Sequence, residues 1–183
     1  MLCRCRPRGR ARRGCSREVA PERIILSAAI KTESLLSLAV SQGVTISCDS
    51  RAESARIAAI AQDLRTTARV APRLAPDPAH LPPTRFGEKL RAWRQVEWPE
   101  SLLVAGVHVH LHVYSEADRR TALAEAISLV EHLRAVGQPA GFIDIGGGVP
   151  MSYLESREQW ENYLECIASQ RAGTGEPFTW KSD

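Results

Sequence analysis

The sequence has 183 residues, enough to bury one sizeable core, and its 44% hydrophobic and 25% charged residues are ordinary for a globular protein. No apolar run approaches the length of a membrane-spanning helix, so we expect no membrane partner. The formal net charge of +3 is unevenly placed, because residues 1–17 hold seven arginines and no acid. The remainder carries about −4 by subtraction, and we expect no specific nucleic-acid partner.

Residues 1–17 show no hydrophobic periodicity, and we predict a disordered arginine-rich tail there. A nucleic-acid-binding arm, a targeting peptide and a thiolate metal site from Cys3, Cys5 and Cys15 are weaker alternatives. The whole chain has five cysteines, an odd number that does not suggest a disulfide framework. This usage favours a reducing, cytoplasmic compartment.

From Pro21 onward, short apolar strands alternate with amphipathic helices. The predicted strands are Ile24–Leu26, Val44–Cys48 and Thr67–Ala75, and the predicted helices are Glu33–Gln42 and Glu53–Leu64. Ser50 and Glu53 have the spacing of a capping box, which predicts the start of the second helix. A proline-rich loop over 76–84 follows, and then a short helix within Leu90–Val96 with Trp93 and Trp98 packed beneath it.

The stretch from Val104 to Tyr153 is predicted to form a strand, a helix, a second strand and a glycine triplet. In VAGVHVHLHV, valine and leucine occupy one face, whereas Gly106, His108, His110 and His112 occupy the other. This pattern suits a parallel barrel, whose apolar face meets helices while the other face points inward.

A helix follows from Ser115 to about Gly137, and GFIDI then forms a buried strand. Gly146, Gly147 and Gly148 come next. Glycines at such a turn either cradle a phosphate with backbone N–H groups or simply allow a tight turn. A further helix is predicted from Ser156 to Gln170.

Five consecutive β/α units without hairpin signals predict an α/β fold with parallel strands, either a doubly wound sheet or part of a (β/α)8 barrel. We assign residues 18–172 to this domain and 173–183 to a polar tail. Isolated edge strands would expose apolar surface, so self-association of the chain is predicted.

Six motifs in order resemble the barrel domain of fold-type III pyridoxal phosphate enzymes, of the diaminopimelate, ornithine and arginine decarboxylase type. They are PERIILSAAIK, VTISCDSRAE, VAPRLAP, TRFG, GVHVHLH and FIDIGGG. The resemblance implies a partial (β/α)8 barrel of about five units, a pyridoxal phosphate cofactor and an amino-acid substrate. Family enzymes are homodimers.

The resemblance also implies roles for individual residues. Gly146, Gly147 and Gly148 match the phosphate-binding loop, and His110 matches the histidine that stacks on the cofactor ring. Arg73 matches an arginine directed into the active site, and Arg85-Phe86-Gly87 matches a motif of the pocket wall. From the residues alone, Arg73 could instead pair with Asp49 or Asp144, and His110 could be a core histidine.

Departures from the family pattern bear on activity. The Schiff-base lysine of an AVKAN-like motif has no counterpart here, and Lys31 matches a different family lysine. The family's phosphate-contacting serine is replaced at Val113, unless Ser115 takes its place. Glu176-Pro177 only superficially resembles the family's EPG motif. The sequence therefore predicts a truncated, inactive barrel with weak or vestigial cofactor binding, and no catalytic residue is assigned.

Two alternatives remain open at this point. The chain could hold pyridoxal phosphate or another phosphate without chemistry. Less favoured is a metal-dependent hydrolase in which His108 and His110, two residues apart on one strand, share a zinc ion with Asp144.

Overall fold

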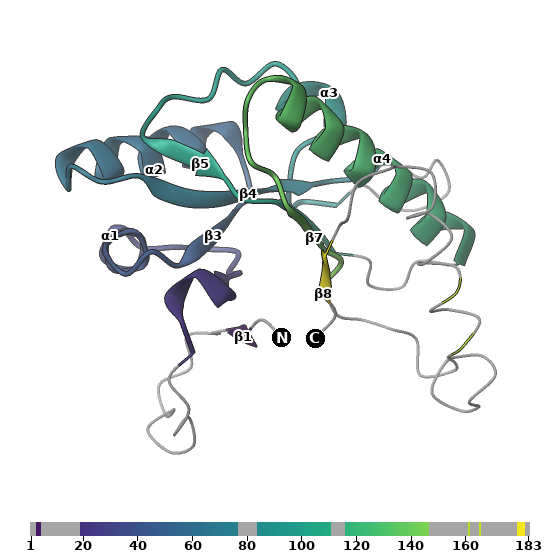
Figure 1. The fold of residues 1–183 in the computed structure, drawn as a ribbon, viewed down its shortest axis with the longest axis horizontal. Coiled ribbons are helices and arrows are strands. Elements are labelled where there is room, and N and C mark those ends of the chain that lie inside the picture. Colours follow the sequence, from purple (N-terminus) through teal and green to yellow (C-terminus); the bar gives the residue numbers. More distant parts are fainter. Residues whose placement is uncertain are drawn as a thin grey trace.

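A computed structural model describes residues 3–4, 19–76, 84–110, 116–146, 161, 165 and 179–181. These residues form one parallel sheet in the order β1-β2-β3-β4-β6-β7-β8, with β5 also beside β4. Because neighbours in the sheet follow chain order, the sheet grows in one direction and curves into an arc (Figure 1). This arrangement confirms the predicted α/β class and partial barrel.

The elements have the following bounds. The strands are β1 Cys3–Arg4, β2 Ile24–Leu26, β3 Thr45–Cys48, β4 Ala68–Leu74, β5 Leu102–Val104, β6 Val107–Val109, β7 Phe142–Asp144 and β8 Thr179–Lys181. The helices are α1 Glu33–Ser41, α2 Arg51–Asp63, α3 Leu90–Trp93 and α4 Glu116–Ala135, and a 3-10 turn spans Pro21–Arg23. Most bounds lie within two residues of the prediction.

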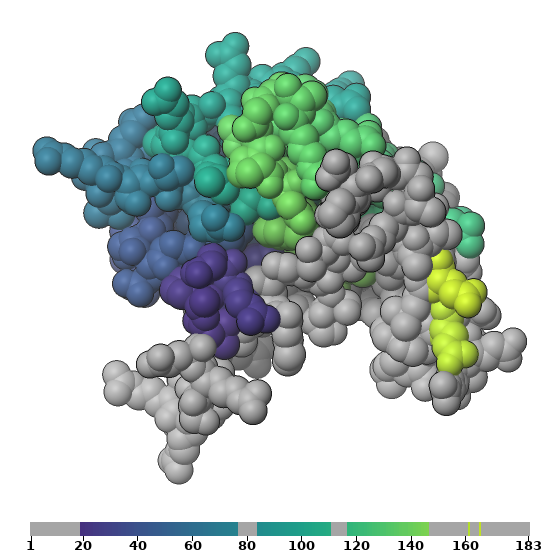
Figure 2. Space-filling model, viewed as in Figure 1, coloured from purple at the N-terminus to yellow at the C-terminus, as the bar shows by residue number. Residues whose placement is uncertain are grey.

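The helices cover one face of the sheet, where the main core lies. Alternate strand residues point toward this core, and they pack with the apolar stripes of the helices. The strands contribute Ile46, Cys48, Val70, Leu74, Val107 and Val109, and the helices contribute Leu36, Ile57, Leu129 and Leu133 among others. Figure 2 shows the purple, blue, teal and green parts of the chain, which carry these elements, packed against one another. Trp93 of α3 and Trp98 pack on this core as predicted, and their rings also stack on each other, with centroids 6.1 Å apart.

The opposite face of the sheet is the inner face of the arc. It carries a small apolar cluster of Ile25, Ala71, Ala105 and Phe142, one residue from each of several adjacent strand segments. The strand residues adjacent to these four in sequence point to the opposite face, and those in the core belong to the helix-facing cluster. The two-residue period of the strands thus separates a helix-facing surface from an inner surface.

The predicted strand that begins at Val104 is divided in the structure. β5 pairs with the start of β4, whereas β6 pairs with its end. Gly106 lies in the interruption, and a Cβ there would stand 2.5 Å from the backbone oxygen of Phe142 and 2.6 Å from its ring. Only glycine lets the chain pass β7 this closely.

The edges of the sheet differ from the prediction. β2 pairs with β1, and β7 pairs with β8, so both predicted outer strands have short neighbours. The sequence did not predict β8, because three residues after a polar stretch give no periodic signal. Self-association stays a prediction. The remainder of the arginine-rich tail and most of the predicted helix over Ser156–Gln170 lie outside the described residues.

The described helices were also compared with the length and apolar character that a membrane span requires. None of those within the described ranges meets both requirements.

We predict that Gly106→Ala lowers the free energy of unfolding by about 1–3 kcal/mol, because the added methyl group overlaps Phe142. Gly141→Ala is the matched control, since its Cβ would meet Pro139 only at an ordinary 3.5 Å. Urea denaturation of both variants measures the difference. Equal stability of the two variants would show that β6 and β7 do not approach as described.

Candidate functional site

Polar residues line up across the inner face where the parallel strands end. The register places Arg73 of β4 beside His108 of β6, and His108 beside Asp144 of β7. Asp49 directly follows β3, whose last residue pairs with the residue before Arg73. These four residues form what we call the polar row. Active sites of parallel α/β folds lie at this carboxyl end of the strands.

Asp144 contacts two residues, His108 of the polar row and Gly146. Its Oδ2 lies 3.4 Å from Nδ1 of His108, and its Oδ1 accepts the backbone N–H of Gly146 at 2.9 Å. Both His108 and Asp144 are buried. Gly146 has a φ of +67°, a conformation that favours glycine, so the first glycine of the predicted triplet makes a left-handed turn closed by Asp144. Gly147 and Gly148 lie outside the described residues.

Arg73 is held on two sides. Its NH1 donates to Oδ1 of Asp49 at 3.3 Å, and its guanidinium carbon lies 4.9 Å from the centroid of the Phe86 ring. Both the ion pair and the cation–π contact favour one orientation of the guanidinium. Of the two pairings that the sequence left open, the one with Asp49 is present.

Gly87 explains how Phe86 reaches Arg73. Its φ is +82°, and a Cβ would stand 2.5 Å from the backbone oxygen of Arg73. The same oxygen accepts the Glu88 N–H at 3.0 Å and the Trp93 indole N–H at 2.8 Å. The predicted Arg85-Phe86-Gly87 segment therefore lies against the end of β4.

A second ion pair, which sequence reasoning missed, supports Asp49. The ammonium of the buried Lys31 lies 2.9 and 3.1 Å from the two carboxylate oxygens of Glu53. Oε2 of Glu53 also accepts the backbone N–H of Asp49 at 2.8 Å. The sequence identified Glu53 only as part of a capping box, in which its side chain would return to Ser50. The Ser50 hydroxyl does accept the Glu53 N–H, at 3.1 Å.

Burial governs the ionisation of this region. It raises the pKa of Asp49, an effect that the charges of Arg73 and Lys31 partly oppose and that of Glu53 reinforces. Burial, and then the Glu53 charge, also raise the pKa of the neighbouring Cys48 thiol. Cys48 is therefore an inert core thiol, whereas an ionised Asp49 is unfavourable for folding.

Two further residues of the predicted site are His110 and Ser115. The ring of His110 lies 6.4 Å from that of His108 and is tilted by 43°, so His110 is next to the polar row. Ser115 lies outside the described residues. Within the described ranges, no group of three His, Cys, Asp or Glu side chains is arranged to hold a metal ion.

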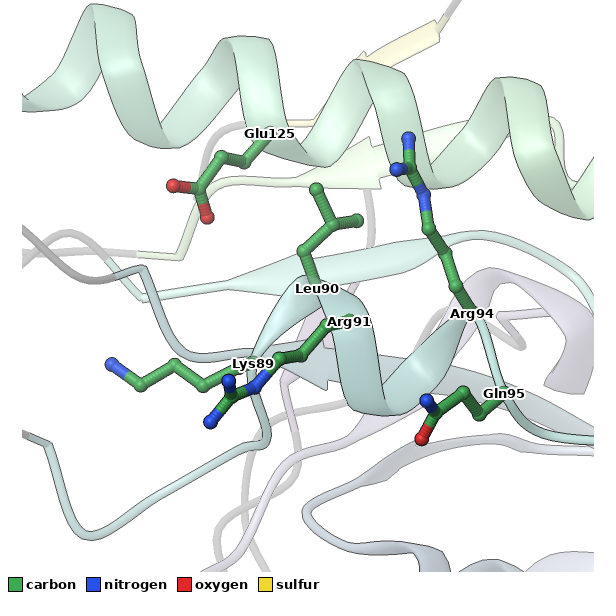
Figure 3. A pocket seen from close by; sticks show the side chains of 6 residues that line it. All are labelled: Lys89, Leu90, Arg91, Arg94, Gln95 and Glu125. Carbon is green, nitrogen blue, oxygen red and sulfur yellow. The ribbon is translucent and has the colours of Figure 1, made fainter.

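A surface hollow of about 570 Å³ lies elsewhere, between α3 and α4 (Figure 3). Leu90 and Arg94 extend toward α4, and Arg94 donates to the hydroxyl of Ser128 at 2.6 Å. The hollow is lined by Lys89, Leu90, Arg91, Arg94, Gln95 and Glu125. None of these belongs to the polar row, so we treat the polar row as the candidate site.

Comparison with known proteins identifies the family of the chain. The family model described as "Pyridoxal-dependent decarboxylase, pyridoxal binding domain" matches residues 11–176. The chain belongs to this family. It is 30% identical over 151 residues to the diaminopimelate decarboxylase of Aquifex aeolicus, which covers 74% of this chain. The resemblance inferred from the six motifs is confirmed.

Solved structures of related decarboxylases share the fold. The Helicobacter pylori diaminopimelate decarboxylase complexed with L-lysine has a TM-score of 0.71 at 22% identity and covers 88% of this chain. The arginine decarboxylase of Paramecium bursaria Chlorella virus bound to agmatine has a TM-score of 0.70 at 20% identity and covers 89%. The chain spans 36% of the Aquifex relative and 45–46% of these two structures.

The raised pKa of Asp49 gives a prediction for the stability of this chain. The native state holds the proton of Asp49 more tightly than the unfolded chain, so Asp49 makes the free energy of unfolding fall as pH rises from its ordinary pKa to the raised one. We predict that Asp49→Asn is at least as stable as the wild type at pH 7 and loses this part of the pH dependence. Urea denaturation between pH 4 and pH 7 measures both quantities. A variant markedly less stable at pH 7 would contradict the prediction.

Proposed function

We propose that this chain binds pyridoxal phosphate at the carboxyl ends of β3, β4, β6 and β7. The observation that carries the proposal is the polar row, in which Asp49, Arg73, His108 and Asp144 meet on the inner face of the arc. The family assignment supports the same cofactor.

The described residues suit a phosphorylated heterocycle in charge and in the types of side chain that they offer. Arg73 offers a guanidinium that Asp49 and Phe86 orient, and guanidinium groups bind phosphate by paired hydrogen bonds. Asp144 holds the Gly146 turn, which leads into the rest of the glycine triplet. The ring of His110, which is only partly buried and lies next to His108, offers a flat surface for an aromatic ligand.

When bound in an enzyme, pyridoxal phosphate supplies an electron sink for the carbanion that decarboxylation produces. The chain's own residues would bind and orient the cofactor, with Arg73 carrying the countercharge and Asp144 fixing His108. The named relatives are decarboxylases of diaminopimelate or arginine. We therefore propose an amino acid with a second polar group as the substrate class for this site.

We further propose that the chain by itself holds the cofactor without turnover. A covalent link would need an accessible, deprotonated amine. The sequence has three lysines, Lys31, Lys89 and Lys181. Lys31, near the carboxyl end of β2, has a fully buried side chain that pairs with both oxygens of Glu53. This pairing favours reversible cofactor binding, the non-catalytic alternative, over a covalent role for Lys31.

Titration with pyridoxal phosphate tests the binding site. We predict saturable binding, followed by absorbance or calorimetry, and about a tenfold loss of affinity in Arg73→Ala because a charge-assisted contact is removed. Arg94→Ala, in the hollow between α3 and α4, is the matched control and keeps wild-type affinity. An Arg73 variant that binds as tightly as the wild type would contradict the site.

Borohydride reduction of the cofactor-treated chain tests the absence of a covalent link. We predict scattered, substoichiometric pyridoxyl labelling in peptide mass maps, because the buried ammonium of Lys31 is ion-paired with Glu53. We also predict no decarboxylation of lysine, ornithine or diaminopimelate. Stoichiometric labelling of one lysine together with turnover would show that the chain is an active enzyme.

A further inference from the structure

We infer that Asp49 is a positioning residue, which holds the guanidinium of Arg73 in the orientation that the cofactor phosphate requires. The inference deepens the proposed function and rests on it for the ligand. Its starting point is the ion pair itself, in which NH1 of Arg73 lies 3.3 Å from Oδ1 of Asp49 and both side chains are largely buried.

Neighbouring contacts orient Asp49 in turn. The backbone N–H of Asp49 donates to Glu53, and Glu53 is fixed by the buried Lys31. The Arg56 guanidinium also donates to the backbone oxygen of Lys31 at 3.2 Å. A continuous chain of contacts therefore runs from the loop after β2, through the start of α2, to the end of β4.

Asp49 is unlike a side chain that serves stability alone. Its Oδ2 is buried and has no hydrogen-bond partner among the described residues. Glu53, by contrast, has contacts on both oxygens. Burial also raises the pKa of Asp49, so its charged form opposes folding. An acid that is unfavourable for folding but aligned with a ligand-facing arginine is typical of a functional site.

Phe86 accounts for the other side of Arg73. Its ring lies under the guanidinium, and Gly87 allows this close approach. An aromatic face attracts a guanidinium without a directional acceptor, so it does not by itself hold NH1 in one place. Asp49 supplies a directional acceptor for NH1, and rotation about the Nε–Cζ bond must break this contact.

Nitrogen-15 NMR of the arginine side chains tests the inference on the full chain without any cofactor. The quantity measured is the rate of rotation about the Nε–Cζ bond of Arg73, with its signals identified by their loss in Arg73→Lys. We expect rotation about tenfold faster in Asp49→Ala, and an intermediate rate in Asp49→Asn, which keeps an oxygen acceptor.

Glu88→Gln is the matched control. The Glu88 carboxylate binds the start of α2, where it accepts the backbone N–H and the Nε–H of Arg51 at 2.6 and 2.8 Å, so it is engaged by Arg51 and not by Arg73. We expect wild-type rotation in this variant. Unchanged rotation in folded Asp49→Asn and Asp49→Ala, or equal acceleration in Glu88→Gln, would overturn the inference. Thermal unfolding confirms that each variant is folded, and Asp49→Asn keeps the test valid if Asp49→Ala does not fold.

Cofactor affinity gives a second, separable readout. If Asp49 acts through Arg73, Asp49→Ala and Arg73→Lys weaken pyridoxal phosphate binding by similar factors, and the double variant binds no more weakly than either one. Additive losses would show that Asp49 acts independently, which contradicts positioning. Failure of the wild type to bind would instead refute the proposed function, while the rotation rates still decide the role of Asp49.

Discussion

The carboxylate of Glu53 is the contact on which the described site depends. It binds the buried ammonium of Lys31 and the backbone N–H of Asp49, so it joins the loop after β2 to the end of β3 at the start of α2. A buried lysine without this partner would be strongly unfavourable, since an unpaired charge cannot remain in a core. Breaking the pair would therefore disturb the fold and release Asp49, and with it Arg73.

The inner face of the arc combines this rigid support with groups suited to an anionic, aromatic ligand. Arg73 gives the positive charge, Asp144 orders both His108 and the Gly146 turn, and Phe86 closes one side. These side chains come from different strands, and the parallel sheet brings their carboxyl ends to one edge. The fold thus concentrates polar groups there while the helix-facing surface stays apolar.

Two close backbone approaches shape the site as much as its charges do. Gly106 lets β6 pass Phe142, and Gly87 lets the segment after β4 lie on the backbone of Arg73. The motif GVHVHLH pointed to Gly106 through its alternation, and TRFG pointed to Gly87 through the family resemblance. Neither motif indicated which backbone atoms exclude a Cβ, because those atoms belong to segments distant in sequence.

The sequence by itself determined the α/β class, most strand and helix positions, the cap at Ser50 and the family. These features follow from short-range periodicity and from motifs, which a linear chain displays directly. The tertiary structure decided that Arg73 pairs with Asp49, that Lys31 is committed to Glu53, and that β5 and β6 are separate along β4. It also added β1 and β8 at the edges of the sheet. Such pairings depend on strand register and on burial, because two residues far apart in sequence can form a contact only after the sheet has brought them together.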